Sequence, residues 1–408
     1  MTASTDPHQS EAGNRLHRPG SPDYRRFNLA MMLAGLGAFG ILYAAQPVLP
    51  QISEEFGVSP TRASLAVSAS TGALALFVLP AAALAIRWGR VRTMRAGLLL
   101  AVLLTLLAAA APTFGSLIAL RALTGAVLAG VVAVAMGHVG SETHPSGLGS
   151  AMGLYVAGNS LGGVGGRLIT AAVADATSWR WGVGLLAAAA LVVTLAFWRL
   201  LPEPVALEED DPREDATVGR ILSKPGVWAL VAIPFLLMGG FVAVYNYLGY
   251  RLLAAPFSLP LAVAGLVFLA YLGGSVSSAV AGRLADAVGR PRVLVAAVLL
   301  MGAGLALTVP DRLVLVIVGL LVFTTGFFAA HAVASGWMPV VAAPHRTRGS
   351  ALYVCGYYAG SSVFGALLGL TWTDAGWTGV AAGVGVLVAL ALVATGAVVR
   401  ATTRRTPG

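Results

Sequence analysis

Apolar residues occur along this chain in twelve long runs that short polar segments separate. An α-helix rises 1.5 Å per residue, so about 20 apolar residues are needed to cross the roughly 30 Å of hydrocarbon in a bilayer. The runs have about this length, and each therefore predicts one membrane-spanning helix. Their bounds, each good to a few residues, are 27–48, 64–86, 93–111, 115–137, 149–173, 181–200, 227–249, 259–281, 292–309, 313–337, 349–371 and 378–398.

The composition excludes a soluble fold. Hydrophobic residues make up 57% of the 408 residues and charged residues 11%, against about 45–50% and about 25% in ordinary soluble domains. The 50 glycines and 21 prolines suit membrane helices, which pack closely and bend. The single cysteine, Cys355, excludes an intrachain disulfide. The first apolar run is too long for a cleaved signal peptide, so we expect it to remain as an anchor.

The positions of the basic residues predict the orientation in the membrane. With a cytoplasmic N-terminus, 20 of the 26 Lys and Arg lie in cytoplasmic segments and four in external loops, and such an excess marks the cytoplasmic side. The polar segment 201–226 carries an acidic cluster and predicts a solvated cytoplasmic linker. We therefore expect a disordered N-terminal tail at 1–26 and a six-helix bundle at 27–200. The linker joins this bundle to a second six-helix bundle at 227–398, and a C-terminal tail follows at 399–408.

Short stretches of sequence recur at a distance of about 200 residues. GRVR at 89–92 returns as GRPR at 289–292, LYVAG at 154–158 returns as LYVCG at 352–356, and the TG pair at 124–125 returns at 325–326. The matches fall at equivalent points of two six-helix halves. Parallel halves of this kind imply a pseudo-two-fold axis along the membrane normal, with a solute path between them.

Four segments of the chain resemble three known motifs. AALAIRWGR at 82–90 and GRLADAVGR at 282–290 resemble the pattern G-x-x-x-D-R-x-G-R; the first copy lacks the acid and the second lacks the arginine. RALTG at 121–125 resembles R-x-x-x-G, and GNSLGGVGGR at 158–167 resembles the exporter signature G-x-x-x-G-P with Gly163 in place of proline. On these motifs, residues 25–400 resemble the major facilitator superfamily, in its twelve-span bacterial branch similar to drug:proton antiporters. The resemblance implies an all-α membrane fold of two pseudo-symmetric six-helix bundles.

Two groups of motif residues have a structural and a functional interpretation. Arginines at cytoplasmic helix ends anchor the topology and favour anionic lipid. The resemblance implies in addition a cytoplasmic gate that latches the halves, made of Arg87, Gly89, Arg90, Gly282, Asp286, Gly289 and Arg290. The glycines at positions 158, 162 and 166 form a stripe of small residues, which favours close helix packing. The segment Gly147-Leu148-Gly149 superficially resembles a nucleotide loop, but no strand precedes it, so we discard that interpretation.

Two arginines, Arg121 and Arg167, lie inside predicted spans, each about six residues from the external end. An arginine inside a span costs roughly 2.5–3.5 kcal/mol on insertion scales, which favours a functional role. The alternative is a side chain that extends to the outer interface. The twelve runs contain no Asp or Glu. Because a desolvated cation needs a counter-charge, the sequence favours a neutral or anionic solute over a permanent cation.

His331 is the single histidine inside a predicted span. Histidine titrates near neutral pH, which makes His331 the candidate proton carrier; the alternative is a histidine satisfied within the core. The resemblance places solute contacts on spans one, four, seven and ten, with contributions from five, eight and eleven. The polar and aromatic residues there are the candidate cavity residues Tyr43, Gln46, Arg121, Asn159, Arg167, Tyr245, Asn246, His331 and Tyr357.

The function that the sequence favours is secondary active transport by alternating access, as proton-coupled efflux of a small neutral or anionic organic solute. The alternatives are uptake or facilitated diffusion of a sugar or organic anion, and a non-transporting membrane receptor. An enzyme is disfavoured, because the sequence shows no paired intramembrane carboxylates, no metal-spaced His/Cys set and no nucleotide loop. We expect no catalytic residue, no metal, no cofactor besides a proton gradient and no nucleic-acid partner. The expected form is a monomer in the lipid bilayer of the plasma (inner) membrane, acting on a small-molecule substrate.

Overall fold

The structure is a computed structural model that describes residues 16–204, 218–224 and 226–403. Within these ranges the chain is helical apart from turns and an isolated bridge between His17 and Thr143. The all-α fold predicted from the sequence is confirmed. The acidic cluster of the linker and most of the two predicted tails lie outside the described residues.

The N-terminal half contains six long helices and several short ones. The short elements connect the first two long helices at one end and precede α8 at the other. In chain order the elements are α2 (Pro22–Leu42), η1 (Gln46–Val48), α3 (Leu49–Phe56), α4 (Pro60–Ala63), α5 (Leu65–Trp88), α6 (Arg90–Ala109), α7 (Phe114–Glu142), η2 (Pro145–Gly147), α8 (Leu148–Ala176) and α9 (Trp179–Leu200).

The C-terminal half repeats this plan. Its last element joins two helices across a kink, because Ala375 and Gly376 have non-helical backbone angles. The elements are α10 (Val218–Leu222), α11 (Val227–Leu253), α12 (Leu261–Gly265), η3 (Leu266–Leu269), α13 (Ala270–Val288), α14 (Arg290–Leu307), α15 (Leu313–Ala342) and α16 (Arg346–Thr403).

Ten helices of the described chain are long and apolar enough to cross a membrane. One of the ten is α16, whose kink divides it into two crossings. The 29-residue α8 is not among the ten; its glycines and Arg167 make it less apolar, although it packs on α2 and α9 of its own half. These helices make twelve crossings, as the apolar runs predict.

Glycines set the same turn in both halves. Gly89 lies between α5 and α6 with φ +89°, and Gly289 lies between α13 and α14 with φ +93°. Backbone in this region strains residues with a side chain, and glycine adopts it at no steric cost. The repeated segment G-R-x-R therefore forms the same tight turn between two helices in each half.

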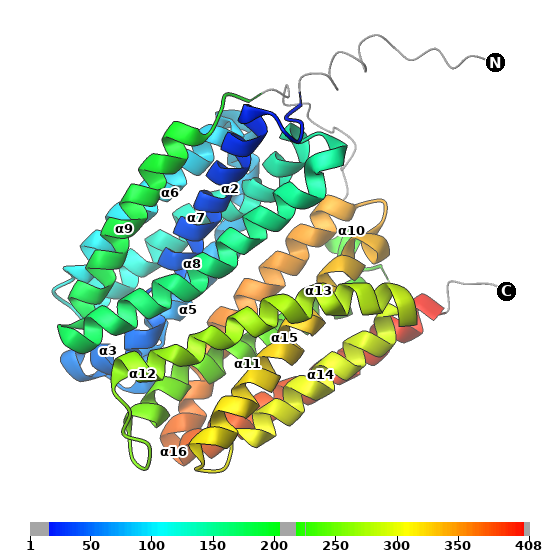
Figure 1. Cartoon of the computed structure of the whole chain (residues 1–408). Helices are drawn as coiled ribbons and strands as arrows, with labels where there is room; N and C mark the ends of the chain where they lie inside the picture. The colour runs from blue at the N-terminus through cyan, green and yellow to red at the C-terminus, as the bar shows by residue number, and fades with distance from the viewer. Residues whose placement is uncertain (1–15, 205–217, 225, 404–408) are drawn as a thin grey trace, which may run out of the picture.

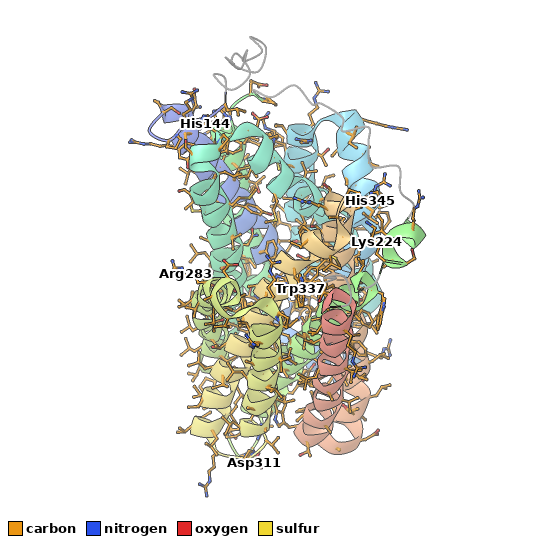
Figure 2. The ribbon with its side chains drawn as sticks, turned by 90° about the vertical axis from the view of Figure 1, so that its right-hand side faces the viewer. His144, Lys224, Arg283, Asp311, Trp337 and His345 are labelled. Carbon is orange, nitrogen blue, oxygen red and sulfur yellow. The ribbon has the colours of Figure 1, made fainter. Side chains whose placement is uncertain are left out.

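Two groups of helices meet at one end of the molecule and diverge toward the other, where the described part of the chain begins and ends (Figure 1). We name the end that carries His144, Lys224 and His345 the tail end, and the opposite end, which carries Asp311, the far end (Figure 2). In the described residues, seven side-chain hydrogen bonds join the halves, and none of them involves a residue of the loops at the tail end. One of these bonds joins Cys355 of α16 to the Ala75 carbonyl of α5. In this conformation the halves are packed together at the far end.

Close helix contacts within each half depend on glycine. A Cβ atom at Gly158 or Gly162 of α8 would overlap a backbone carbonyl oxygen of α2, at Met32 and Leu36 respectively, and one at Gly166 would lie 2.8 Å from the Cα of Gly40. In the C-terminal half, Cβ atoms at positions 356 and 360 of α16 would meet the carbonyl oxygens of residues 231 and 235 of α11. The packing thus has the same repeat as the sequence.

Replacing Gly162 with alanine is expected to lower the free energy of unfolding by about 2 kcal/mol or more. An overpacked contact costs about 1–3 kcal/mol or more, while the gain in helix propensity is only about 1 kcal/mol. The matched control is Gly153→Ala on the same helix, because a Cβ at Gly153 meets nothing within 4 Å. Thermal unfolding of the purified variants measures both effects. Equal melting of the two variants would contradict this account of the glycine stripe.

Candidate functional site

The first spanning helix is broken close to the junction of the halves. α2 ends at Leu42, and the chain continues through Tyr43, with φ −108° and ψ 15°, into the short turn that starts at Gln46. Pro47 contributes to the break, because it has no amide hydrogen to donate to the preceding turn. The break exposes carbonyl oxygens at the end of α2, and two buried arginines bind on either side of it.

Arg121 of α7 stabilises the end of α2. Its Nε donates to the Ala66 carbonyl at 2.9 Å, its Nη1 to the Ile41 carbonyl at 3.1 Å, and its Nη2 to the Leu42 carbonyl. The last carbonyls of a helix have no partner within the helix, and a positive charge there is favourable. Arg121 is only 1% exposed. The structure therefore places it among backbone carbonyls inside the N-terminal half, and not at the outer interface.

Arg167 of α8 lies at the junction between the halves. Its Nε donates to Gln46 Oε1 at 2.7 Å and its Nη1 to the Gly163 carbonyl at 2.6 Å. The guanidinium carbon lies 4.4 Å from the ring centre of Tyr43, 4.9 Å from that of Tyr271 and 5.1 Å from that of Phe268. The last two rings belong to the C-terminal half. Aromatic faces attract a cation, so this arginine connects the two halves.

The guanidinium of Arg167 keeps unused hydrogen-bonding capacity. Its side chain is 2% exposed, yet within the described chain no carboxylate pairs with it and no acceptor binds its second terminal nitrogen, Nη2. A buried charge is costly unless it is paired and hydrogen-bonded. Aromatic rings and two neutral acceptors compensate it only in part. The site is therefore suited to accept a further electron-rich group.

Gln46 and Asn246 mark the axis between the halves. Gln46 Nε2 donates to Asn246 Oδ1 at 2.8 Å, and Asn246 Nδ2 donates to the Gly365 carbonyl at 3.2 Å. The two residues are 200 positions apart, which is the spacing of the internal repeat. Equivalent positions of two halves touch each other only close to the pseudo-two-fold axis. The chain Arg167–Gln46–Asn246 thus crosses this axis by hydrogen bonds.

A layer of aromatic side chains from the C-terminal half lies against Arg167. Phe241 stacks on Phe327 with ring centres 3.9 Å apart, and Tyr245 lies 5.0 Å from Tyr271. The Tyr245 hydroxyl is satisfied by Thr324 Oγ1 at 2.8 Å. Such a layer offers flat apolar surfaces and excludes water from the junction.

His331 of α15 borders this layer. Its Nδ1 lies 2.9 Å from the Tyr353 hydroxyl, its ring centre lies 4.9 Å from that of Tyr357, and it stacks on Phe327 at 6.1 Å. The residue is half-buried. His331 therefore has a tyrosine partner within hydrogen-bonding distance, and the structure brings it and Tyr357 together on the C-terminal side of the junction.

Several polar atoms near the junction have no partner in the described chain. They include the hydroxyl oxygens of Tyr43 and Ser361 and the side-chain oxygen of Asn159. Asn159 lies against Gly35 of α2, so it faces its own half more than the junction. Buried polar groups are normally satisfied, and each exception requires an explanation. A bound solute that supplies donors and acceptors would provide one.

Sequence reasoning missed three residues of this site. Phe268 and Tyr271 stack on Arg167, and Ser361 carries one of the unpartnered hydroxyls. The resemblance already assigned part of the cavity to spans eight and eleven, where these residues lie. Tyr271 is the one tyrosine of the eighth apolar run, and that signal could have identified it.

The gate motif lies at the tail end, where the halves diverge. Arg90 Nη1 donates to Ser141 Oγ of α7 at 3.0 Å, within the N-terminal half. A Cβ atom at Gly89 or Gly282 would meet nothing within 4 Å, and one at Gly289 would meet only Pro291 of its own loop. The two copies of the motif therefore do not pack on each other at these glycines in this conformation.

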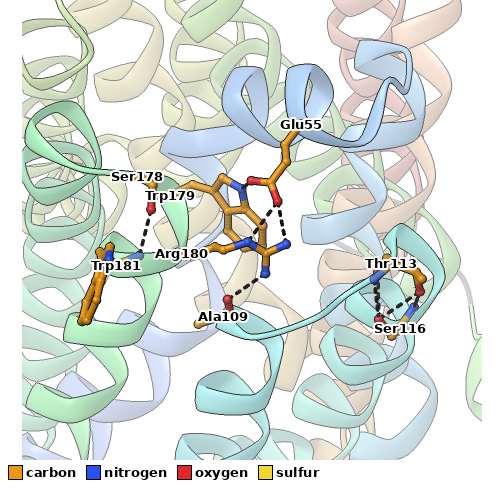
Figure 3. A network of polar contacts seen from close by, with 8 residues as sticks. All are labelled: Glu55, Ala109, Thr113, Ser116, Ser178, Trp179, Arg180 and Trp181. Atoms are coloured by element: carbon orange, nitrogen blue, oxygen red, sulfur yellow. Dashed lines mark hydrogen bonds and ion pairs between the residues drawn. The ribbon is translucent and has the colours of Figure 1, made fainter.

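Polar contacts at the far end lie both within the N-terminal half and between the halves. Glu55 of α3 accepts hydrogen bonds from Trp179 Nε1 and from Arg180, whose Nη1 also donates to the Ala109 carbonyl at 3.0 Å (Figure 3). Between the halves, Asp175 Oδ1 accepts from the Leu261 amide at 2.9 Å. Ser53 and the Leu49 carbonyl both bind the hydroxyl of Tyr250, at 3.0 Å and 2.9 Å. Within the described residues, few side-chain hydrogen bonds join the two halves, as expected of an interface that opens during transport.

Two similar helical bundles that enclose polar residues on their common axis define the class of membrane transporters with parallel repeats. The model of the Major Facilitator Superfamily matches residues 29–262, and the chain belongs to this family. The class predicted from the sequence is therefore confirmed.

Relatives and solved structures agree with this assignment. The inner membrane transport protein YnfM of Escherichia coli (strain K12) is 39% identical over 396 residues, covering 96% of this chain and 94% of YnfM. The uncharacterized MFS-type transporter YybF of Bacillus subtilis (strain 168) is 37% identical over 384 residues, covering 92% and 93%. A bacterial homolog of the human lysosomal transporter Spinster, crystallised inward-facing and unoccupied, superimposes with a TM-score of 0.74 at 16% identity, covering 94% and 96%. This last similarity shows the shared fold.

Proposed function

We propose that this chain exports a small neutral or anionic organic solute across the inner membrane in exchange for protons. The observation that carries the proposal is Arg167, a buried guanidinium at the junction of the halves with no carboxylate partner in the described chain. An anionic or hydroxyl-rich solute supplies the acceptor that Nη2 lacks. A permanent cation would be repelled by the same charge.

The basic residues support an orientation in which the tail end and both termini are cytoplasmic. In that orientation the closed far end faces outward and the structure is an inward-facing state. Solute enters from the cytoplasm toward the aromatic layer and Arg167. Opening to the outside then requires the bonds between Gln46 and Asn246, Asp175 and Leu261, and Tyr250 and Leu49 to break.

The direction of transport is supported by the motif in α8, where GNSLGG resembles the exporter signature. One observation favours a second transport function, the uptake of an organic anion: the arginine on the axis between the halves attracts an anion from either side of the membrane.

The proton gradient is the proposed driving force, and a single chain contains both halves of the path. We therefore propose a monomer that needs no further cofactor.

We propose His331 as the proton carrier. It is half-buried beside the aromatic layer, and Tyr353 lies within hydrogen-bonding distance of its Nδ1. A proton bound there adds a positive charge beside the solute path. The charge state of His331 would thereby couple proton binding to solute binding.

Proteoliposomes that hold a pH-sensitive dye test the proposal. Neutral, anionic and cationic solutes are added in turn, and movement of a neutral or anionic solute is expected to shift the internal pH. His331→Ala should retain solute exchange at equilibrium but lose the pH change, while His345→Ala at the tail end should keep both. A pH change with cationic solutes alone would overturn the charge argument. An unchanged response in His331→Ala would exclude this carrier and leave the transport function standing.

A further inference from the structure

Four arginines surround a hollow on the N-terminal half at the tail ends of α5 and α6. The hollow has a volume of about 500 Å³, and Arg87, Arg90, Arg92 and Arg95 line it together with Glu203. One carboxylate against four guanidinium groups leaves the lining positive. The hollow also lies at the start of α6, whose N-cap residue Gly89 offers no side-chain cap to the first amides. A helix start of this kind adds to the attraction for an anion.

Arg87, Arg92 and Arg95 retain free hydrogen-bonding capacity. Arg87 and Arg92 are exposed and form no hydrogen bond or ion pair with the described part of the chain. Arg95 donates Nη2 to the Trp198 and Leu201 carbonyls, while its Nε is buried without a partner. Guanidinium groups bind phosphate through paired hydrogen bonds. The hollow therefore presents unused donors for an oxyanion.

An apolar groove continues from the hollow along the same helices. It has a volume of about 230 Å³, lies between α5, α6 and α7, and is lined by Phe77, Leu84, Leu100 and Val127 among others. Trp88, which is 56% exposed, lines both the hollow and the groove. Tryptophan is enriched where the polar and apolar zones of a membrane meet. The charged and the apolar parts thus join at the depth where a lipid head meets its chains.

The groove opens on the lipid-facing side of the N-terminal half. α6 packs on α2, α5, α7 and α9 of its own half, and its outward-facing leucines, Leu100, Leu103 and Leu107, are exposed. We infer that the hollow and the groove together bind one anionic phospholipid, with its phosphodiester among the arginines and an acyl chain in the groove. A free phosphate would use the hollow alone and leave the groove unexplained.

The second copy of the motif provides a control within the same chain. Its loop carries Arg283, Arg290 and Arg292, but Asp286 stands at the position that Ile86 occupies in the first copy. A carboxylate there repels a phosphodiester and can pair with the neighbouring arginines. The proposed lipid site therefore belongs to the N-terminal copy.

Binding of dioleoylphosphatidylglycerol to the purified full chain in neutral detergent, followed by native mass spectrometry, tests the proposal. Each arginine near a membrane surface contributes about fivefold to anionic lipid binding, so Arg87→Gln with Arg92→Gln should weaken binding about 25-fold. Arg290→Gln with Arg292→Gln should change it less than about twofold, and dioleoylphosphatidylcholine should bind weakly to every form. Gel filtration and thermal unfolding show that the variants are folded. Equal loss in the two double variants, or no loss in either, would overturn the site.

Two further experiments distinguish a bound lipid from other occupants of the hollow. Ala96→Phe fills the groove. It should weaken the binding of phosphatidylglycerol and leave the binding of glycerol phosphate unchanged. If each ligand binds wild type and Ala96→Phe equally well, the hollow is a phosphate site and the lipid proposal fails. The acidic linker is the other candidate occupant. If phosphatidylglycerol binds only after the acidic side chains are replaced by amides, the linker fills the hollow and the proposal is wrong. The residues to replace are Glu208, Glu209, Asp210, Asp211, Glu214 and Asp215.

Discussion

Replacing Arg167 with glutamine is expected to reduce the transport of an anionic solute about 100-fold. The substitution keeps a polar side chain, although a shorter one, and removes the charge and the stacked guanidinium. A hydrogen bond to a charged group contributes about 1.5–3 kcal/mol, and about 2.7 kcal/mol corresponds to the predicted 100-fold loss. A neutral solute should lose less, because it pairs with the guanidinium without a full charge. Initial rates in proteoliposomes measure both.

Arg167→Lys distinguishes charge from geometry. Lysine retains the positive charge, but it cannot donate to Gln46 and Gly163 in the planar arrangement of a guanidinium or stack on three rings in the same way. We expect transport between the rates of wild type and of Arg167→Gln. A lysine variant as inactive as the glutamine variant would assign the role to the planar geometry of the guanidinium, since the charge would then be insufficient.

Arg180→Gln is the matched control for Arg167. Arg180 also lies over aromatic rings, at 4.6 Å from Trp179 and 5.7 Å from Phe56, but all its partners belong to the N-terminal half and it is paired with Glu55 (Figure 3). Its loss should leave transport close to wild type. If anion transport falls equally in the two variants, Arg167 has no special relation to the solute, and the anionic preference proposed here is wrong.

Replacing Arg121 with methionine is expected to destabilise the N-terminal half by about 3–5 kcal/mol. The substitution leaves the carbonyls of Ile41, Leu42 and Ala66 buried without their donor, and each such group costs about 1–3 kcal/mol. In a bundle of about 200 residues, a loss of this size lowers the melting midpoint by roughly 10 °C. Thermal unfolding of the detergent-solubilised protein measures the shift.

Arg312→Met is the control for this prediction, because Arg312 is exposed at the far end. Its melting midpoint should stay within about 2 °C of wild type, since surface changes are usually small. If Arg121→Met melts like wild type but no longer transports solute, Arg121 acts in the transport cycle and does not hold the end of α2. Loss of both stability and transport agrees with the role that the hydrogen bonds indicate.

The sequence predicted the helices well, because membrane insertion depends on local properties. A run of about 20 apolar residues has one stable conformation in hydrocarbon, where each backbone donor must bind within its own segment. The repeat was also visible, since Gly89 and Gly289 occupy turns that favour glycine. The resemblance to the superfamily rested on these same segments, and the family assignment is confirmed.

The candidate site was predicted only in part. Gln46, Arg167 and Asn246 were selected because they are polar residues inside apolar runs, and the structure joins them in one hydrogen-bonded chain. The same criterion selected Asn159, which lies beside Gly35, and it passed over Tyr271. A polar residue in an apolar run indicates that its side chain needs a hydrogen-bonding partner, but the sequence of the run does not identify that partner.

From sequence alone, this protein is a twelve-crossing membrane protein with two similar halves and an excess of buried positive charge over buried carboxylate. Those properties follow from segment length, spacing and composition. The tertiary structure decided which arginine holds α2 and which lies on the axis between the halves. The partners of Arg121 are 55 to 80 residues away and Gln46 is 121 residues from Arg167. Such contacts depend on the rotation of each helix and on the break after Leu42, which only the packed bundle determines.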